Sequence, residues 1–295
     1  MKKQKVEKLL ILGGLPRDYL QEWEITADLQ RIRERLSVEV EQVPVERVMA
    51  TLEALDEPGH REAEELAGQL IAGAERSEVP DRLRRSVELY VAVRRMLREC
   101  GAQGVTVNCG AWKDDRDRPL PCLGLMLLQE QGVAAVCQGD MDAFLTAVLF
   151  HRAGAWPTYI GGPHPVEEDV VDVSHCVLPR TMASPHASPQ PYYLADYHGN
   201  GWGCTVHSRV PEDTVVTVAR LTCGLEGLLM GVGTVEGTAD RADRCRNTVY
   251  VRMAGAETLM GALRGHQQHL VVACGDHREV IGRRARARGI EVRSV

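Results

Sequence analysis

The sequence predicts an α/β protein with two parts. A doubly wound (Rossmann- or flavodoxin-like) parallel-sheet domain is expected over residues 1–154, followed by an α+β domain with an antiparallel β-barrel-like core over residues 155–295. Three observations indicate this division. Apolar runs alternate with segments of helical periodicity in the first half. After about residue 155 the chain becomes rich in turn residues and short β-rich runs, and helix and strand patterns return only near the end.

The strands of the first half are expected where apolar residues form short runs or alternate with polar ones. The first run, "KLLIL", ends at Gly13 and Gly14, as a buried parallel strand leading into a turn does. Four segments fit this description: residues 8–12, 38–43, 105–108 and 133–137.

The helices of the first half are expected where apolar residues recur three and four positions apart. Pro80 suits the first turn of one of them, and residues 122–132 form another between two strands. The apolar faces consist of Ile25, Leu29, Ile32 and Leu36; Leu66, Leu70, Ile71 and Ala74; and Leu83, Val87, Tyr90 and Leu97.

The sequence pattern of the second half predicts a small antiparallel barrel. Segments 161–169 and 180–193 contain Pro, Gly, Ser and His without helical period, and β-rich runs follow. These runs are residues 213–221, 227–237 and 247–255. The chain then predicts a helix, a strand, a helix and a strand over residues 256–265, 269–276, 277–289 and 290–295.

Composition excludes several classes of protein. A net charge of −6 argues against a nucleic-acid-binding protein. The basic run from Arg283 to Arg288 is interpreted as the solvated face of a helix. The sequence contains no run of 18 apolar residues, so it predicts no transmembrane helix. The N-terminus does not have the pattern of a signal peptide. Nine cysteines without a CxxC pair indicate reduced thiols in the cytoplasm.

The carboxyl ends of the predicted parallel strands carry Asn108, Cys109 and Asp140, and ligands of such sheets bind at these ends. Asp140 has two interpretations. It could cap the following helix, a contact worth about 1 kcal/mol, or it could point its carboxylate into the ligand crevice. Asp142, in the first turn of that helix, is expected to serve the helix dipole.

Histidines supply the other candidate groups. His175 ends a β-like run, while His266 and His269 flank the start of a strand. Asp196 and His198 lie in the Gly-rich loop "ADYHGNGWG". One Asp with separated His residues would suit Mn²⁺ or Mg²⁺. The histidines assigned to the surface are His164, His186, His207 and His277.

Five segments in order make the chain resemble the L-fucose/L-arabinose isomerase superfamily, in its fucose isomerase-like branch. They are "LLILGGLPRD" (9–18), "PCLGLMLL" (121–128), "GVAAVCQGDMDAFLTAVLFHRAG" (132–154), "VVDVSHCVLP" (170–179) and "HQQHLVVACGDHREVIGRRARARGIEV" (266–292). The resemblance covers the family's second and third domains, and the family's first domain has no counterpart in this chain.

This resemblance implies an aldose–ketose isomerase that works through a cis-enediol, with Mn²⁺ polarising adjacent sugar oxygens. Asp140 falls on the family's metal-binding, proton-moving Asp, and His269 is the candidate second ligand, ahead of His266. His175, Gln138, Cys122 and Trp202 are expected to line the substrate site. The resemblance also implies a homo-oligomer, a trimer or hexamer.

Departures from the family pattern keep a second interpretation open. Gln138 stands where the family has an acid, and Cys122 stands near its second catalytic Glu. Cys122 could be a soft ligand or a packing residue. The chain could therefore be a divergent sugar isomerase, or a sugar-binding or assembly subunit that kept the scaffold and lost the chemistry.

Overall fold

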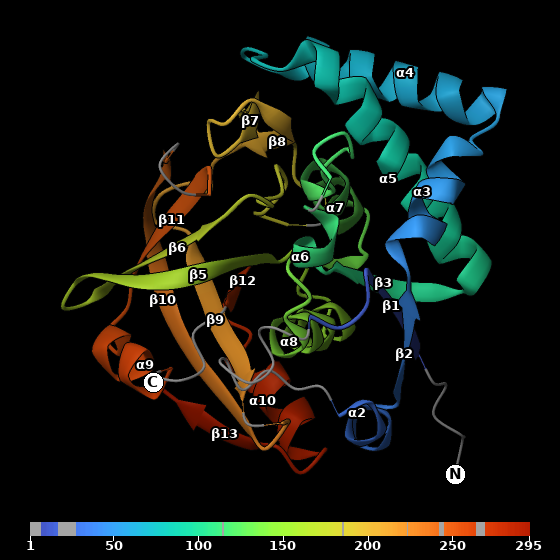
Figure 1. The fold of residues 1–295 in the computed structure, drawn as a ribbon. Helices are drawn as coiled ribbons and strands as arrows, with labels where there is room; N and C mark the ends of the chain where they lie inside the picture. Colours follow the sequence, from blue (N-terminus) through green and yellow to red (C-terminus); the bar gives the residue numbers. More distant parts are fainter. Residues whose placement is uncertain are drawn as a thin grey trace.

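The computed structural model describes residues 7–16, 28–113, 115–184, 186–222, 224–241, 245–263 and 269–295. It is a mixed α/β protein that contains a parallel four-stranded sheet and a closed six-stranded antiparallel β-barrel (Figure 1). No helix in these ranges is both long and apolar enough to cross a membrane.

The parallel sheet has the strand order β2-β1-β3-β4. Its strands are β1 (Glu7–Leu12), β2 (Val38–Val43), β3 (Ala102–Val107) and β4 (Ala134–Val136). The register pairs Leu12 with both Val43 and Val107 and pairs Thr106 with Val136, so all four strands end at the same edge. The residues that follow β3 and β4 are thereby brought together.

Seven helices accompany this sheet within the described residues. They are α2 (Leu29–Leu36), α3 (Val45–Glu53), α4 (Glu57–Gly73), α5 (Pro80–Cys100), α6 (Cys109–Trp112), α7 (Cys122–Glu130) and α8 (Met141–Arg152). Helix α8 is buried from Met141 to Phe150, because it packs on β3 and β4 on one side and on barrel strands β9 and β12 on the other. A helix that is apolar on all faces suits a place between two layers.

The barrel closes because its first and last strands pair with each other. The order is β11-β6-β5-β12-β9-β10, and β10 pairs again with β11. Its strands are β5 (Tyr159–Glu167), β6 (Val170–His175), β9 (Val215–Thr222), β10 (Gly227–Asp240), β11 (Asn247–Arg252) and β12 (Leu270–Cys274). Valines at alternate positions, such as Val216 and Val218 of β9, fill its interior.

The remaining elements surround the barrel. Strand β13 (Glu291–Ser294) pairs in parallel with β10, and β7 (Tyr193–Tyr197) forms a hairpin with β8 (Trp202–His207). The helices are α9 (Ala256–Ala262) and α10 (Arg278–Arg286). Figure 1 shows the hairpin between the barrel and the α4–α5 pair.

The sequence correctly predicts β1 to β4, α5, α7, the runs that form β9, β10 and β11, and the four elements of the C-terminal segment. It misses α3 and the strand β5. It also places Ile71 on a buried face, whereas this side chain is 44% exposed. Strand β12, expected in a second α/β unit, is instead an antiparallel member of the barrel. Residues 17–27, which include Ile25, lie outside the described ranges.

Candidate functional site

Asp140 is both a helix cap and one half of a buried ion pair. One oxygen, Oδ1, accepts a hydrogen bond from the Ala143 N–H at 3.1 Å, which begins α8. Arg220 of β9 donates to Oδ2 at 2.8 Å and to Oδ1 at 3.3 Å. The Nδ1 atom of His269 lies 3.0 Å from Oδ2. The helix-cap interpretation is therefore confirmed, and the carboxylate faces the barrel.

This ion pair is sealed from solvent, since Asp140 and Arg220 both have no exposed surface. Burial alone would raise the pKa of Asp140, but the Arg220 guanidinium and His269 hold it well below its ordinary value. Asp142 adds a second carboxylate 3.8 Å from Arg220. A carboxylate that stays ionised and has both oxygens bonded is suited to holding the start of α8 against barrel strand β9.

A second cluster lies at the carboxyl edge of the parallel sheet, where five of the nine cysteines line one small cavity. The cavity encloses about 10 Å³, which is room for about one water molecule. The five are Cys109, Cys122, Cys137, Cys176 and Cys245.

The fold explains why these thiols meet. Cys109 follows β3, Cys137 follows β4, and Cys122 opens α7, so three thiols reach the same edge of the sheet. The barrel supplies the other two. The β6–β11 register pairs His175 with Asn247, so Cys176, just after β6, and Cys245, just before β11, lie at one end of the barrel.

The thiols form a continuous chain of contacts. The Sγ atoms of Cys109 and Cys137 are 3.0 Å apart, and Cys122 lies close enough to Cys137 and Cys176 for their thiols to lower its pKa. The chain continues from Cys176 to Cys245. The neighbouring Cys176 thiol, assisted by His175 and His198, lowers the pKa of Cys245.

Lys113 and Tyr197 also line the cavity and are joined by a 2.5 Å hydrogen bond from Nζ to the phenol oxygen. Burial would lower the pKa of Lys113, but its position beside the Cys109 thiol and the bond to Tyr197 raise it. Burial raises the pKa of Tyr197 to about 12. At neutral pH the pair is therefore an ammonium beside a neutral phenol.

His175 stands between the two clusters. Its ring lines the cavity and lies 5.1 Å, centroid to centroid, from the ring of His269. It is 3% exposed, and neither ring nitrogen has a hydrogen-bond partner among the described residues. Burial lowers its pKa to about 4. It is thus a neutral, buried imidazole whose nitrogens remain available to a small ligand.

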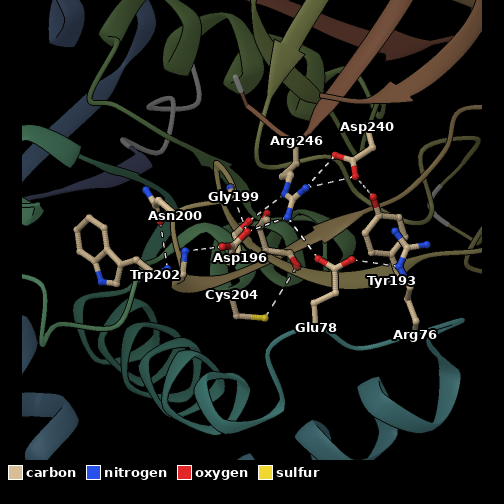
Figure 2. A network of polar contacts seen from close by, with 12 residues as sticks. Arg76, Glu78, Tyr193, Asp196, Gly199, Asn200, Trp202, Cys204, Asp240 and Arg246 are labelled. Atoms are coloured by element: carbon tan, nitrogen blue, oxygen red, sulfur yellow. Dashed lines mark hydrogen bonds and ion pairs between the residues drawn. The ribbon is translucent and has the colours of Figure 1, made fainter. Parts of the chain in front are cut away.

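Figure 2 shows the polar network around Arg246, which joins the β7–β8 turn of Asp196 and Gly199 to the barrel residue Asp240. Arg246, next to Cys245, donates to Asp196 at 2.7 Å, and it also contacts Asp240 and Glu78. Asp196 in turn accepts from the backbone of Gly199 and Gly201, which shapes the β7–β8 turn. One buried guanidinium thereby fixes both the segment of Cys245 and the segment of His198.

Trp202 lies beside a neighbouring groove of about 270 Å³ rather than in the thiol-lined cavity. Arg82, Arg116 and Asp117 also line this groove. The Trp202 ring makes an edge contact with Tyr197, 6.2 Å between centroids. Tyr197 lines the cavity and Trp202 lines the groove, so this edge contact connects the walls of the two spaces.

The structure thus divides the predicted site residues into three places. Asp140 and His269 meet in the ion-pair network. Cys122, Gln138 and His175 meet at the cavity, and Trp202 lines the groove. His266 lies outside the described residues. His207, assigned to the surface, is only 6% exposed because β8 packs it against Tyr193.

Sequence reasoning missed Lys113, Tyr197, Cys176, Cys245 and Arg220. A high cysteine count was the only signal for the thiols, because each comes from a different segment. No protein-family model matches the chain, and no curated protein is significantly similar to it in sequence. The fold and site therefore define a class only in structural terms: an α/β sheet joined to a closed barrel, with a thiol-lined cavity between them.

Proposed function

We propose that the protein is a sugar isomerase-like enzyme that interconverts an aldose and a ketose, acting on a monosaccharide or related polyol at the cavity edge. The observation that supports this proposal is that residues from distant segments meet at one cavity. Three segments singled out by the resemblance place Cys122, Gln138 and His175 around the hydrogen-bonded pair of Lys113 and Tyr197. Ligands of parallel α/β sheets bind at this edge.

The groups present suit the proton transfers of an enediol reaction. The Lys113 ammonium and the Tyr197 hydroxyl would bind the adjacent oxygens O1 and O2 and stabilise the negative charge that develops there. His175, neutral and without a hydrogen-bond partner among the described residues, would accept the proton from C2 and return it to C1. The hydroxyl proton moves from O2 to O1, so the sugar gains and loses no atoms.

Manganese does not fit the donors of this cavity. Mn²⁺ prefers carboxylate, carbonyl and water oxygens, whereas the described lining of the cavity has five thiols, one imidazole and no carboxylate. Both Asp140 oxygens are already engaged by Arg220, His269 and the helix backbone. We therefore route no step of the proposed reaction through Mn²⁺.

The test is exchange of the C2 hydrogen of a panel of aldoses in D₂O, followed by NMR. Tyr197→Phe and His175→Gln should each slow exchange by about 10²–10⁴-fold, the usual contribution of one acid–base group. His164→Gln is the matched control, because His164 is 54% exposed on β5. Absence of exchange with every sugar would overturn the enzyme proposal.

A second candidate is a sugar-binding or assembly subunit without catalysis. The observation in its favour is the size of the cavity, which has room for about one water molecule. The groove beside Trp202 is closer to ligand size. Calorimetric sugar binding that Trp202→Ala abolishes, without C2 exchange, would support this candidate over the enzyme.

Three further expectations belong to this proposal. The parallel sheet is doubly wound, the chain assembles as a trimer or hexamer, and the protein works in the reducing cytoplasm. Light scattering of the purified protein tests the assembly, and a monomeric mass would remove that part of the proposal.

A further inference from the structure

The barrel end of the cavity gathers three metal-binding atoms that the proposed reaction does not use. The Sγ atoms of Cys176 and Cys245 and one ring nitrogen of His198 all lie within 4.8 Å of one another. The Nε2 atom of His198 is 3.3 Å from the Cys245 sulfur. In a tetrahedral zinc site, with Zn–S near 2.3 Å, neighbouring donor atoms are about 3.8 Å apart. The three atoms are therefore close to the required spacing before any ion is bound.

We propose that Cys176, Cys245 and His198 bind one soft divalent ion of the zinc class, with the fourth coordination position open to the cavity. Cys176 and Cys245 both line that cavity, and its volume admits about one water molecule. Two cysteines, one histidine and an open position form a donor set that zinc adopts in catalytic sites. Two thiolates also neutralise a divalent cation, which suits a buried location.

The backbone of the His198 turn holds the imidazole in place beside Cys245. His198 has a φ of 56°, in the left-handed region that non-glycine residues rarely adopt. Asp196 stabilises this conformation by accepting hydrogen bonds from the Gly199 and Gly201 N–H groups. Such backbone cost persists only where surrounding contacts impose it. Here the contacts direct the imidazole toward the Cys245 sulfur.

Arg246 is inferred to be a positioning residue for this site. Its 2.7 Å contact with Asp196 joins the segment of Cys245 to the turn of His198 (Figure 2). It touches none of the three donor atoms in the contacts described. Loss of such an outer contact commonly weakens metal binding by about 10–100-fold.

A bound ion would also give the cavity a chemical role. With one coordination position open, it would polarise the one water molecule that the cavity has room for. The metal site itself is inferred from the donor geometry and does not depend on the proposed sugar chemistry.

The experiment is anaerobic titration of the full-length, reduced, chelator-treated protein with Co²⁺, followed by displacement with Zn²⁺. One equivalent of Co²⁺ should bind and produce tetrahedral d–d bands with thiolate-to-cobalt charge transfer. His198→Gln and Cys245→Ser should abolish tight binding, and Arg246→Gln should weaken it about tenfold or more. Cys100→Ser, a half-buried thiol at the end of α5, should bind as the wild type does.

Each outcome decides the proposal. Absence of Co²⁺ and Zn²⁺ binding would overturn it, and so would unchanged affinity in both His198→Gln and Cys245→Ser. His198 lies on a hairpin turn, so its substitution tests the site without disturbing the core, and circular dichroism verifies folding of each variant. C2 exchange in a protein that binds no metal would overturn the proposed metal site and leave the proposed isomerase function unaffected.

Discussion

Replacement of Asp140 by Asn is expected to destabilise the protein strongly, because it leaves the Arg220 guanidinium buried beside a neutral amide. Both side chains are fully buried, and their closest approach is 2.8 Å. Removal of one partner of a buried ion pair costs about 3–5 kcal/mol. Asp142, 3.8 Å from the guanidinium, supplies partial compensation, so we expect the lower end of that range.

The substitution isolates the charge, because Asn caps helices about as well as Asp. An unfolding entropy near 2.1 cal/mol/K per residue over 295 residues converts a loss of 3 kcal/mol into a decrease in Tm of about 5 °C. Urea unfolding followed by circular dichroism measures the free energy directly. The double variant Asp140→Asn/Arg220→Met should lose less than the sum of its two single variants.

Asp276→Asn is the control, because this carboxylate is 45% exposed and pairs with Arg278 at the surface. It should change the free energy of unfolding by no more than about 0.5 kcal/mol. A loss below about 1 kcal/mol for Asp140→Asn would refute the structural role of the ion pair. A loss that disappears when both proteins are treated with chelator would instead identify Asp140 as a metal ligand.

Three other outcomes follow from the structure. His151 and His207 have pKa values lowered to about 4 by burial, so between pH 4 and 6.5 the unfolded chain binds more protons. The free energy of unfolding should therefore fall as the pH drops through this window, by up to about 1.4 kcal/mol per pH unit for each histidine. In urea titrations, His207→Gln should reduce the slope of the free energy of unfolding against pH. Gly203→Ala should cost about 1–3 kcal/mol, because φ is 63° and a Cβ would lie 2.6 Å from Leu120, and the same assay measures it. Gly101→Ala, at a φ of 62° but in open space, should cost only the backbone strain of about 1–2 kcal/mol.

Local periodicity was sufficient for the parallel sheet but not for the whole barrel. Strand β5 reads as a loop because Pro163 and Pro165 interrupt it. The structure tolerates them because β12 pairs only with residues 159–161 of this strand. Beyond that point β5 has β6 as its one partner, so a missing N–H costs no ladder hydrogen bond on the free side. Pairing between distant strands, which no local window contains, decides such cases.

Three of the predicted site residues converge, but the sequence did not indicate the groups that surround them. Strand ends and the family resemblance brought Cys122, Gln138 and His175 to one place. Arg220 could not be anticipated, since an arginine within a β-rich run gives no indication that it is buried opposite a carboxylate 80 residues earlier. Cys176 and Cys245 likewise acquire a shared site only through the β6–β11 register.

The 80-residue separation between Asp140 and Arg220 has a consequence for biosynthesis. At about 5–20 residues per second, the ribosome adds the residues between them in roughly 4–16 s. During that interval the nascent α8 has neither its counterion nor the barrel strands that cover its second apolar face. The N-terminal half therefore cannot complete its fold on the ribosome until β9 has emerged. Slow translation across residues 141–220 should prolong its exposure to chaperones, and a chain stopped near residue 154 should remain aggregation-prone.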